Sequence, residues 1–217
     1  MFNLKSNKYK EDFVFISYYS NDGSYPALAA KLIDSLKRFD LKYDIQVKQP
    51  FASWEDGITY KSEYILERLL HHRKVVIWLD IDTEIWQFPE LLFGSHDFAI
   101  YNWIADNDHH LSGEIEFDIN TKKLICSGGV QKYGYTAAAI ELLLRWIYSI
   151  NETNIKSGDD PILDFAFNRF SPPVNPLWLP KTYNRMDKNT YHWSSIDSSS
   201  VVINHDYTVG GHRSLKS

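Results

Sequence analysis

Two aspartates, Asp80 and Asp82, stand one residue apart at the end of the apolar run Val75-Val76-Ile77-Trp78-Leu79. Five apolar residues in a row, three of them β-branched, predict a strand buried on both faces, as in a parallel α/β sheet. Open α/β sheets bind ligands at the carboxyl ends of such strands. Two hard oxygen ligands there suit Mg²⁺ or Mn²⁺ bridging to phosphate oxygens. The alternative is that both acids only cap a following helix or accept hydrogen bonds in a turn.

A histidine late in the chain is the candidate third ligand. His205 follows a predicted strand at 201–203, and a ring nitrogen would complete an Asp, Asp, His set that Mn²⁺ tolerates better than Mg²⁺ does. Gly210 and Gly211 would let backbone amides approach a diphosphate, with Arg213 nearby as a counter-charge. The alternative is a surface histidine in the tail of the chain.

A second pair of acids, Asp159 and Asp160, precedes Pro161 at the start of a predicted helix. Exposed amides and the helix dipole would stabilise acids there, so capping alone is an adequate explanation. In the functional interpretation, one carboxylate binds sugar hydroxyls and the other faces a cationic reacting carbon, because an oxocarbenium-like centre needs a negative charge nearby. Ser127-Gly128-Gly129 is predicted as a loop where the backbone comes close to a ligand, or equally as a hairpin turn.

The elements that must position these residues follow a β-α-β-α-β order in the first half of the chain, which predicts a doubly wound α/β sheet. The predicted strands cover 13–19, 43–47, 75–79, 97–103, 113–118, 123–126 and 201–203, with 123–126 paired to 113–118. The predicted helices are one that has Pro26 in its first turn and those at 60–70, 135–150 and 161–170. Residues 49–59 are predicted as a loop because they contain Pro50 and Gly57.

The amino-acid composition limits the classes of protein to which the chain can belong. The 217 residues, 44% of them hydrophobic and 15% aromatic, are typical of one folded domain, which we place at 1–217. A net charge of −5 gives no broad basic surface, so nucleic acid and anionic membranes are not expected as partners. We expect neither a signal peptide nor a membrane-spanning run, and the lone Cys126 fits a reducing compartment; a soluble, cytoplasmic protein is therefore predicted.

The chain is also rich in aromatic residues, with seven tryptophans and fourteen tyrosines. Aromatic rings make good platforms for sugars, but most of these rings are expected to pack in the core or at its rim. Trp103 and Trp193 are the candidate aromatic contacts for an acceptor.

Taken together, these motifs resemble the GT-A family of nucleotide-sugar glycosyltransferases over nearly the whole chain. Asp80-Ile81-Asp82 is similar to the metal-binding motif of that family. Ser127-Gly128-Gly129-Val130 resembles the asparagine-alanine-glycine-valine segment of its retaining members related to galactosyltransferases and glycogenins. Residues 159–163 resemble their acidic segment, and His205 with Gly210-Gly211 resembles their late metal-binding histidine and glycine. The order of these motifs is more specific than any one of them.

The resemblance implies a single-domain, Rossmann-like GT-A fold with a mostly parallel central sheet flanked by helices. It also implies Mn²⁺ or Mg²⁺ as cofactor and transfer of a hexose from a UDP-sugar such as UDP-glucose, with retention of the anomeric configuration. The residues that it places around the nucleotide, diphosphate or sugar are Ser17, Tyr19, Asp44, Lys61, Ile81, Gly128, Gly129, Gly211 and Arg213. Asp159 and Asp160 would be catalytic residues that position the sugar. The implied acceptor is a glycan or glycoprotein, and the small size suggests the subgroup that large chlorella viruses encode to decorate their capsid protein.

The sequence departs from the family at two places. Asp160 stands where a glutamine is usual on the reacting face of the sugar, and Gly211-His212-Arg213 replaces a lysine-proline-tryptophan ending. If Asp160 were a base on the opposite face of the sugar, the product would be inverted.

Two other classes stay open on the sequence. A phosphatase of the haloacid dehalogenase type has motifs that Asp80-Ile81-Asp82 and Gly158-Asp159-Asp160 with Asp164 loosely resemble. That family places its nucleophilic aspartate on the first strand, and Glu84 stands where it has threonine or valine. The other class is a non-catalytic module that binds sugar nucleotides.

Overall fold

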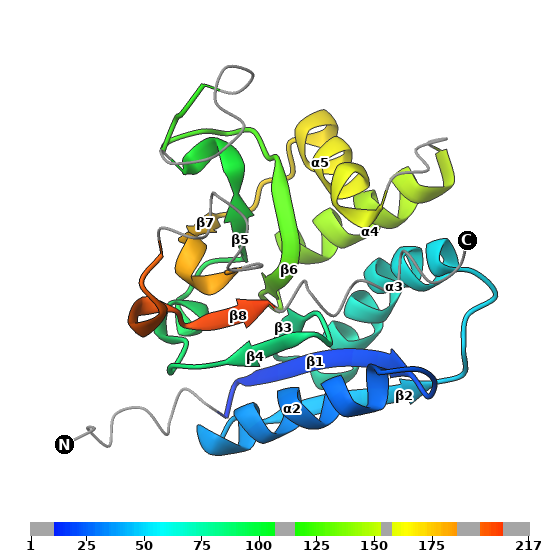
Figure 1. The fold of residues 1–217 in the computed structure, drawn as a ribbon. Coiled ribbons are helices and arrows are strands. Elements are labelled where there is room, and N and C mark those ends of the chain that lie inside the picture. Colours follow the sequence, from blue (N-terminus) through cyan, green and yellow to red (C-terminus); the bar gives the residue numbers. More distant parts are fainter. Residues whose placement is uncertain (1–10, 107–115, 153–157, 186–195, 206–217) are drawn as a thin grey trace.

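The computed structural model describes residues 11–106, 116–152, 158–185 and 196–205. Within them a six-stranded sheet forms the centre of the molecule (Figure 1). Its strands, in spatial order, are β2 (Tyr43–Lys48), β1 (Phe13–Ser20), β3 (Val75–Leu79), β6 (Cys126–Tyr133), β5 (Phe98–Asn102) and β7 (Pro176–Leu179). β6 runs antiparallel to both of its neighbours, and the other adjacent pairs are parallel. The predicted α/β class with a mostly parallel central sheet is confirmed.

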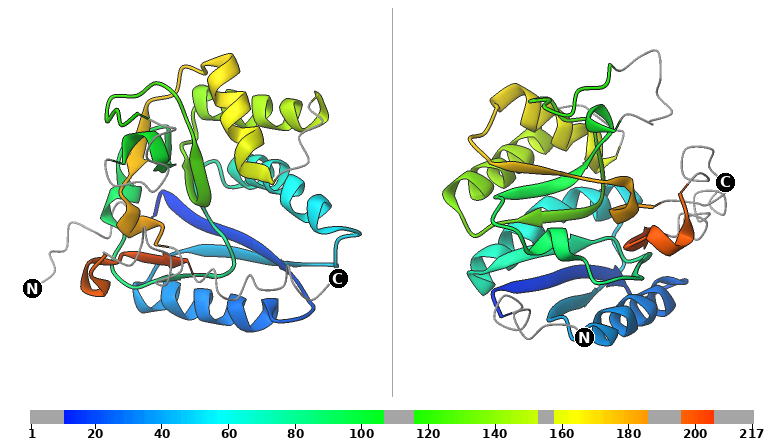
Figure 2. Two further views of the ribbon diagram at one scale, coloured as in Figure 1. Left: turned by 45° about the horizontal axis from the view of Figure 1, so that its top comes forward. Right: turned by 90° about the vertical axis from the view of Figure 1, so that its left-hand side faces the viewer.

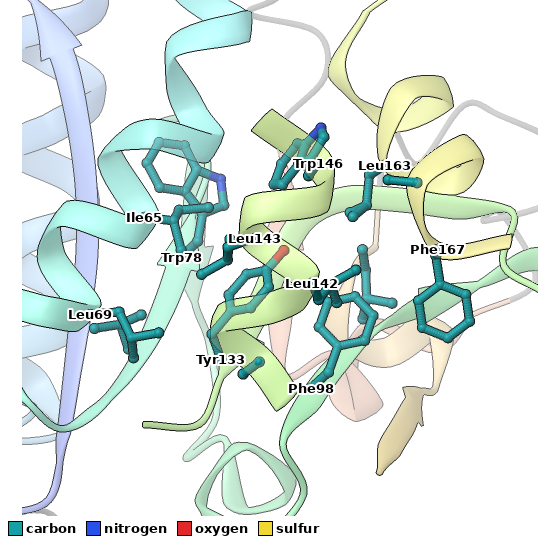
Figure 3. Close-up of a cluster of buried hydrophobic side chains, with 14 of the residues drawn as sticks. Ile65, Leu69, Trp78, Phe98, Tyr133, Leu142, Leu143, Trp146, Leu163 and Phe167 are labelled. Carbon is teal, nitrogen blue, oxygen red and sulfur yellow. The ribbon is translucent and has the colours of Figure 1, made fainter. Parts of the chain in front are cut away.

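Helices cover both faces of this sheet (Figure 2). One face carries α2 (Tyr25–Arg38), and the other carries α3 (Trp54–His72), α4 (Ala137–Glu152) and α5 (Asp159–Phe170). Alternation of side chains along each strand decides which core a residue joins. In β1, Val14 and Ile16 join the core under α3, α4 and α5, whereas Phe13 and Phe15 join the core beside α2. Figure 3 shows part of the first of these cores.

A two-stranded antiparallel sheet lies next to the end of β3. It consists of β4 (Thr83–Ile85) and β8 (Ile203–His205), and Thr83 is opposite His205. Because β4 begins directly after Asp82, this pairing brings a residue from the end of the chain to the predicted pair of acids. Four short 3-10 turns complete the described structure, at Glu90–Phe93, Trp103–Ala105, Lys181–Tyr183 and Ser198–Ser200.

The predicted loop at 49–59 is wrong, because α3 already begins at Trp54. Ser53 caps this helix by accepting a hydrogen bond from the Asp56 backbone N–H at 3.0 Å. Glu55 and Asp56 occupy the first turn, where the helix dipole favours acids. The cap and the acids therefore override Gly57, which only weakens a helix interior.

The glycine loop at 127–129 and the strand boundaries around it are also corrected. Ser127, Gly128 and Gly129 lie inside β6 and are buried, because this strand passes between β3 and β5. The strand predicted at 123–126 starts only at Cys126, and 116–118, the described part of the strand predicted at 113–118, is not a strand. The late strand is Ile203–His205 instead of 201–203, so His205 lies within a strand.

In the described stretches, none of the helices combines the length and the apolar character needed to span a bilayer. That residues 1–217 form one domain stays a prediction.

Candidate functional site

The side chains of Asp80, Asp82 and His205 meet at the carboxyl end of β3. One ligand atom from each lies within 4.8 Å of the other two. His205 Nε2 is 3.0 Å from Asp82 Oδ1 and 3.7 Å from Asp80 Oδ2. The structure thus brings together the three residues that the sequence suggested as metal ligands, although His205 lies 123 positions after Asp82 in the chain. Two carboxylates and one imidazole form a donor set that fits a divalent cation such as Mn²⁺.

Backbone hydrogen bonds fix the turn that carries the two acids. The Asp80 N–H donates to the carbonyl of Gly129 at 2.9 Å, which ties the turn to β6. The N–H and the hydroxyl of Thr83 donate to the Asp80 carbonyl at 3.0 and 2.7 Å. These bonds close the turn between β3 and β4, so Asp80 and Asp82 are held on one side of it.

The electrostatics of the triad couple the histidine to the acids. Burial of His205 disfavours its charged form, but the adjacent carboxylates of Asp82 and Asp80 outweigh this effect and raise the pKa of the imidazole. Burial alone would raise the pKa of Asp82, and the His205 imidazole lowers it instead. The carboxylates that favour a proton on His205 would also favour a metal ion beside them, because a proton and a metal ion both supply positive charge.

Lys61 is a buried cation that joins the acid pair to α5. Its Nζ lies 3.0 Å from Asp80 Oδ1 and 2.5 Å from Asp159 Oδ2. Burial works against the charge, but the carboxylates of Asp159 and Asp80 outweigh it and raise the pKa of Lys61 well above its usual range. The ammonium is therefore charged at neutral pH, and it links Asp80 at the end of β3 to Asp159 at the start of α5.

Asp160 faces β6. Its Oδ2 accepts a hydrogen bond from the Gly128 N–H at 3.1 Å. Burial of the carboxyl, reinforced by the charge of Asp159, raises its pKa well above the usual range. The N-cap residue is Gly158, with a positive φ of 70°, and both acids lie in the first turn of the helix. The acids of α5 therefore contact Lys61 and β6 in addition to lying where the helix dipole favours them.

The two glycines of β6 make room for these side chains. A Cβ at Gly128 would lie 2.2 Å from Asp160 Oδ1, and one at Gly129 would lie 2.5 Å from His205 Nδ1. Both distances are shorter than any real contact, so a larger residue would displace the acid or the imidazole. The structure shows close packing of side chains against these glycines, and the approach of a ligand to this backbone stays a prediction.

Helix α5 pairs with the extended chain at 124–128 through a ladder of side chains. Asp160, Asp164 and Asn168, four residues apart, accept hydrogen bonds from the N–H groups of Gly128, Cys126 and Leu124, two residues apart, at 3.1, 2.9 and 2.8 Å. Asn168 also donates to the Leu124 carbonyl at 2.7 Å. This ladder satisfies the N–H groups of these three residues, and it links α5 to β6.

The other residues predicted to contact the nucleotide lie on or next to strands β1, β2 and β3. Ser17 is buried and its hydroxyl donates to the Leu79 carbonyl at 2.6 Å. Asp44 accepts hydrogen bonds from Arg68 at 3.2 Å and His72 at 2.9 Å, so its carboxylate faces α3 and not the metal triad. Tyr19 is a half-buried residue of β1. Ile81 lies between the two acids and packs against the core beside α2.

Of the two candidate acceptor aromatics, Trp103 is 9% exposed and packs edge-on against Tyr101. Core packing thus accounts for most of its surface. Trp193, Gly210, Gly211 and Arg213 lie outside the described residues.

Sequence reasoning missed two polar side chains around the triad, Trp78 and Asn184. Trp78 donates from Nε1 to Asp80 Oδ1 at 2.7 Å. Asp164, which the sequence suggested only through a resemblance to phosphatase motifs, accepts a hydrogen bond from the Cys126 N–H. Asn184 is fully buried, its amide has no hydrogen-bond partner among the described residues, and its Oδ1 lies 3.0 Å from the Cβ position of Gly129. Nothing in the sequence marks Trp78 or Asn184.

The sequence matches no protein-family model and no curated protein. The fold, however, is one that known glycosyltransferases have, which confirms the predicted GT-A-like architecture. A glycosyltransferase involved in the glycosylation of the major capsid of PBCV-1 is similar with a TM-score of 0.61 and 11% identity, over 89% of this chain and 91% of that one. The glycosyltransferase GlyE of Streptococcus pneumoniae TIGR4 is similar with a TM-score of 0.51 and 15% identity; 89% of this chain is covered, and it spans 53% of GlyE.

Proposed function

We propose that this protein is a metal-dependent glycosyltransferase that moves a hexose from a UDP-sugar, such as UDP-glucose, to a hydroxyl of a glycan or glycoprotein. The observation that carries the proposal is the convergence of Asp80, Asp82 and His205 in a fold that solved glycosyltransferases share. These residues lie at the carboxyl end of β3, and the carboxyl ends of the strands are where α/β folds bind nucleotides.

Asp80, Asp82 and His205 would hold Mn²⁺ or Mg²⁺. Charge supports this assignment, because the carboxylates of Asp80, Asp82 and Asp159 outnumber the single buried ammonium of Lys61. When bound, such an ion neutralises the charge that develops on a departing diphosphate. The side chains themselves orient the donor and balance the charge around it.

The remaining residues divide between the two ends of the donor. Ser17, Tyr19, Asp44 and Ile81 are proposed to line the uridine side, and Gly211 and Arg213 the diphosphate. Asp159, Asp160, Gly128 and Gly129 are proposed to surround the sugar. Lys61 connects the two ends, since it contacts an acid of each.

We expect retention of the anomeric configuration. The resemblance of Ser127-Gly128-Gly129-Val130 and residues 159–163 to segments of the retaining members supports this expectation. An NMR spectrum of the product decides the question, and an inverted anomer would overturn the assignment.

The acceptor is proposed to be a glycan or glycoprotein, with a viral capsid protein as the first to test. The similarity to a glycosyltransferase involved in glycosylation of the PBCV-1 major capsid supports that choice. A cytoplasmic location is proposed as well, since the lone Cys126 is a buried free thiol.

The test is release of UDP from UDP-sugars by the purified chain, with Mn²⁺ and with chelator. Metal-dependent release supports the proposal. Release of phosphate from simple esters, without turnover of any sugar nucleotide, would favour a phosphatase of the haloacid dehalogenase type. Binding of a sugar nucleotide without turnover in the presence of candidate acceptors would favour a non-catalytic module.

A further inference from the structure

We infer that Trp78 is a positioning residue for the metal site: its indole N–H holds one oxygen of Asp80 and leaves only the other oxygen for the cation. The inference rests on the proposed function and adds a residue to it. Trp78 itself points into the core and would not touch the metal or the sugar nucleotide.

The two oxygens of Asp80 have different surroundings. Oδ1 accepts the Trp78 N–H at 2.7 Å and lies 3.0 Å from the ammonium of Lys61. Oδ2 lies on the side of the triad, 3.7 Å from His205 Nε2. A carboxylate whose first oxygen already has two strong donors offers its second oxygen to a metal, so Asp80 would bind through Oδ2 alone.

The indole is well placed to fix this orientation because it cannot move easily. Trp78 is 3% exposed, and its ring packs against Tyr18 and Tyr64 at centroid distances of 5.2 and 6.0 Å. The Lys61 ammonium lies over the face of the same indole, 5.2 Å from the ring centroid. One side chain therefore holds the carboxylate through its N–H and its counter-ion through its ring.

Outer hydrogen bonds of this kind orient metal ligands, and their loss usually weakens metal binding between tenfold and a hundredfold. Trp78→Phe removes the N–H and keeps an aromatic ring under the Lys61 ammonium. We expect this variant to bind Mn²⁺ about tenfold more weakly than the wild-type chain. Its UDP release at limiting Mn²⁺ should fall in parallel and recover at saturating Mn²⁺.

Trp146→Phe is the matched control. Trp146 lies in the same core as Trp78 (Figure 3), is fully buried, and its indole N–H has no hydrogen-bond partner among the described residues. The control makes the same chemical change at similar burial, so it reports the cost of lost packing. Both variants should lose thermal stability in chelator, but only Trp78→Phe should lose affinity for Mn²⁺.

The experiment measures Mn²⁺ binding to the full chain by calorimetry, with thermal unfolding in chelator as the second readout. Equal Mn²⁺ affinity of Trp78→Phe and the wild type, or equal losses in both variants, would overturn the inference and leave the proposed function standing. No binding by the wild type would overturn the metal site and the inference with it.

A measurement on the wild type covers the case in which Trp78→Phe does not fold. In protein labelled with ¹⁵N at tryptophan, the Trp78 indole proton should exchange slowly with solvent both in chelator and with saturating Mg²⁺. If Mg²⁺ made this proton exchange freely, the hydrogen bond to Asp80 would not persist in the loaded site, and the inference would be wrong.

Discussion

At the scale of single residues, the site holds more carboxylate charge than its one buried ammonium compensates. Lys61 pairs with Asp80 and Asp159, while Asp82 pairs with His205. Such an arrangement is costly unless another positive charge arrives, and a divalent ion supplies it.

Asp82→Asn should abolish Mn²⁺-dependent UDP binding and leave the fold intact. The substitution removes a charged ligand but keeps the shape of a residue at a strand end. Calorimetric titration of UDP in the presence of Mn²⁺ is the measurement, and Asp34→Asn on the exposed side of α2 is the control for the chemical change. Unchanged UDP affinity in Asp82→Asn would remove this residue from the metal set.

Asp164→Asn should stabilise the protein above pH 7 and have little effect near pH 4. Burial raises the pKa of Asp164 to about 7, from 3.8. The folded state therefore holds the proton more tightly than the unfolded state, so the free energy of unfolding falls as the pH rises from about 4 to 7 and stays lower above it. Asparagine keeps an acceptor for the Cys126 N–H and does not ionise.

The measurement for Asp164→Asn is urea unfolding of variant and wild type at pH 4, 6 and 8. Each pKa unit of difference between the folded and unfolded states corresponds to about 1.4 kcal/mol, so the rise from 3.8 to about 7 predicts a gain on the order of 4 kcal/mol at pH 8. Asp164→Ala, which removes the acceptor as well, should be less stable than Asp164→Asn at every pH. A gain at pH 8 no larger than at pH 4 would contradict the assigned protonation.

Single residues also show what the sequence could predict about the site. The spacing of Asp80 and Asp82 after an apolar run, and the order of the later motifs, were enough to name the triad that the structure assembles. The contacts of Trp78 and Asn184 were not predictable, because they depend on which core positions lie side by side. A tryptophan in an apolar run looks the same in a sequence whether or not its N–H meets a carboxylate.

At the scale of elements, β6 is the strand on which the site depends. Its carbonyl at Gly129 holds Asp80, and its two glycines leave space for Asp160 and His205. The sequence predicted a loop here, since a Ser-Gly-Gly run is a strong turn signal. The signal fails because the glycines are needed to make space, and because the strands on both sides supply backbone partners that local sequence does not reveal.

Gly129→Ala should weaken Mn²⁺ binding at least tenfold. The new Cβ would lie 2.5 Å from Nδ1 and 2.7 Å from Cε1 of His205, so the imidazole has to move away from the acids. Calorimetric titration with Mn²⁺ measures the loss. Gly57→Ala in α3, whose Cβ would meet only Phe51, is the control and should leave the affinity unchanged. Equal affinities in the two variants would show that His205 does not need this space.

At the scale of the whole molecule, the alternation of strands and helices predicted the architecture, but the sheet contains one reversal that it did not predict. β6 enters between β3 and β5 in the opposite direction. Hydrophobic periodicity shows that a strand exists and which face is buried, but it carries no information about the direction of the neighbouring strands. The β4–β8 pairing, which delivers His205, is likewise a contact between the middle and the end of the chain.

Binding of donor and metal should stabilise the whole fold. A ligand at a hundred times its dissociation constant adds about 2.7 kcal/mol to the free energy of unfolding, which corresponds to roughly 5 to 10 °C in Tm for a chain of this size. Thermal-shift screening of UDP-, GDP- and CMP-sugars with and without Mn²⁺ measures this. We expect the largest shift for a UDP-sugar with Mn²⁺, and the same shift in Asp82→Asn would contradict a metal-bridged donor.

The ladder between α5 and residues 124–128 limits how these two segments can change length. Four residues of helix advance about 6.0 Å, and two residues of extended chain advance about 6.6 Å. The advance per rung therefore differs between helix and extended chain by roughly half an ångström. Three rungs can absorb this difference, but a much longer ladder could not. Successive N–H groups of an extended chain point to opposite sides, so inserting or deleting one residue between Leu124 and Gly128 would turn the N–H groups beyond the change away from α5, and Asp160 would lose its place opposite Gly128.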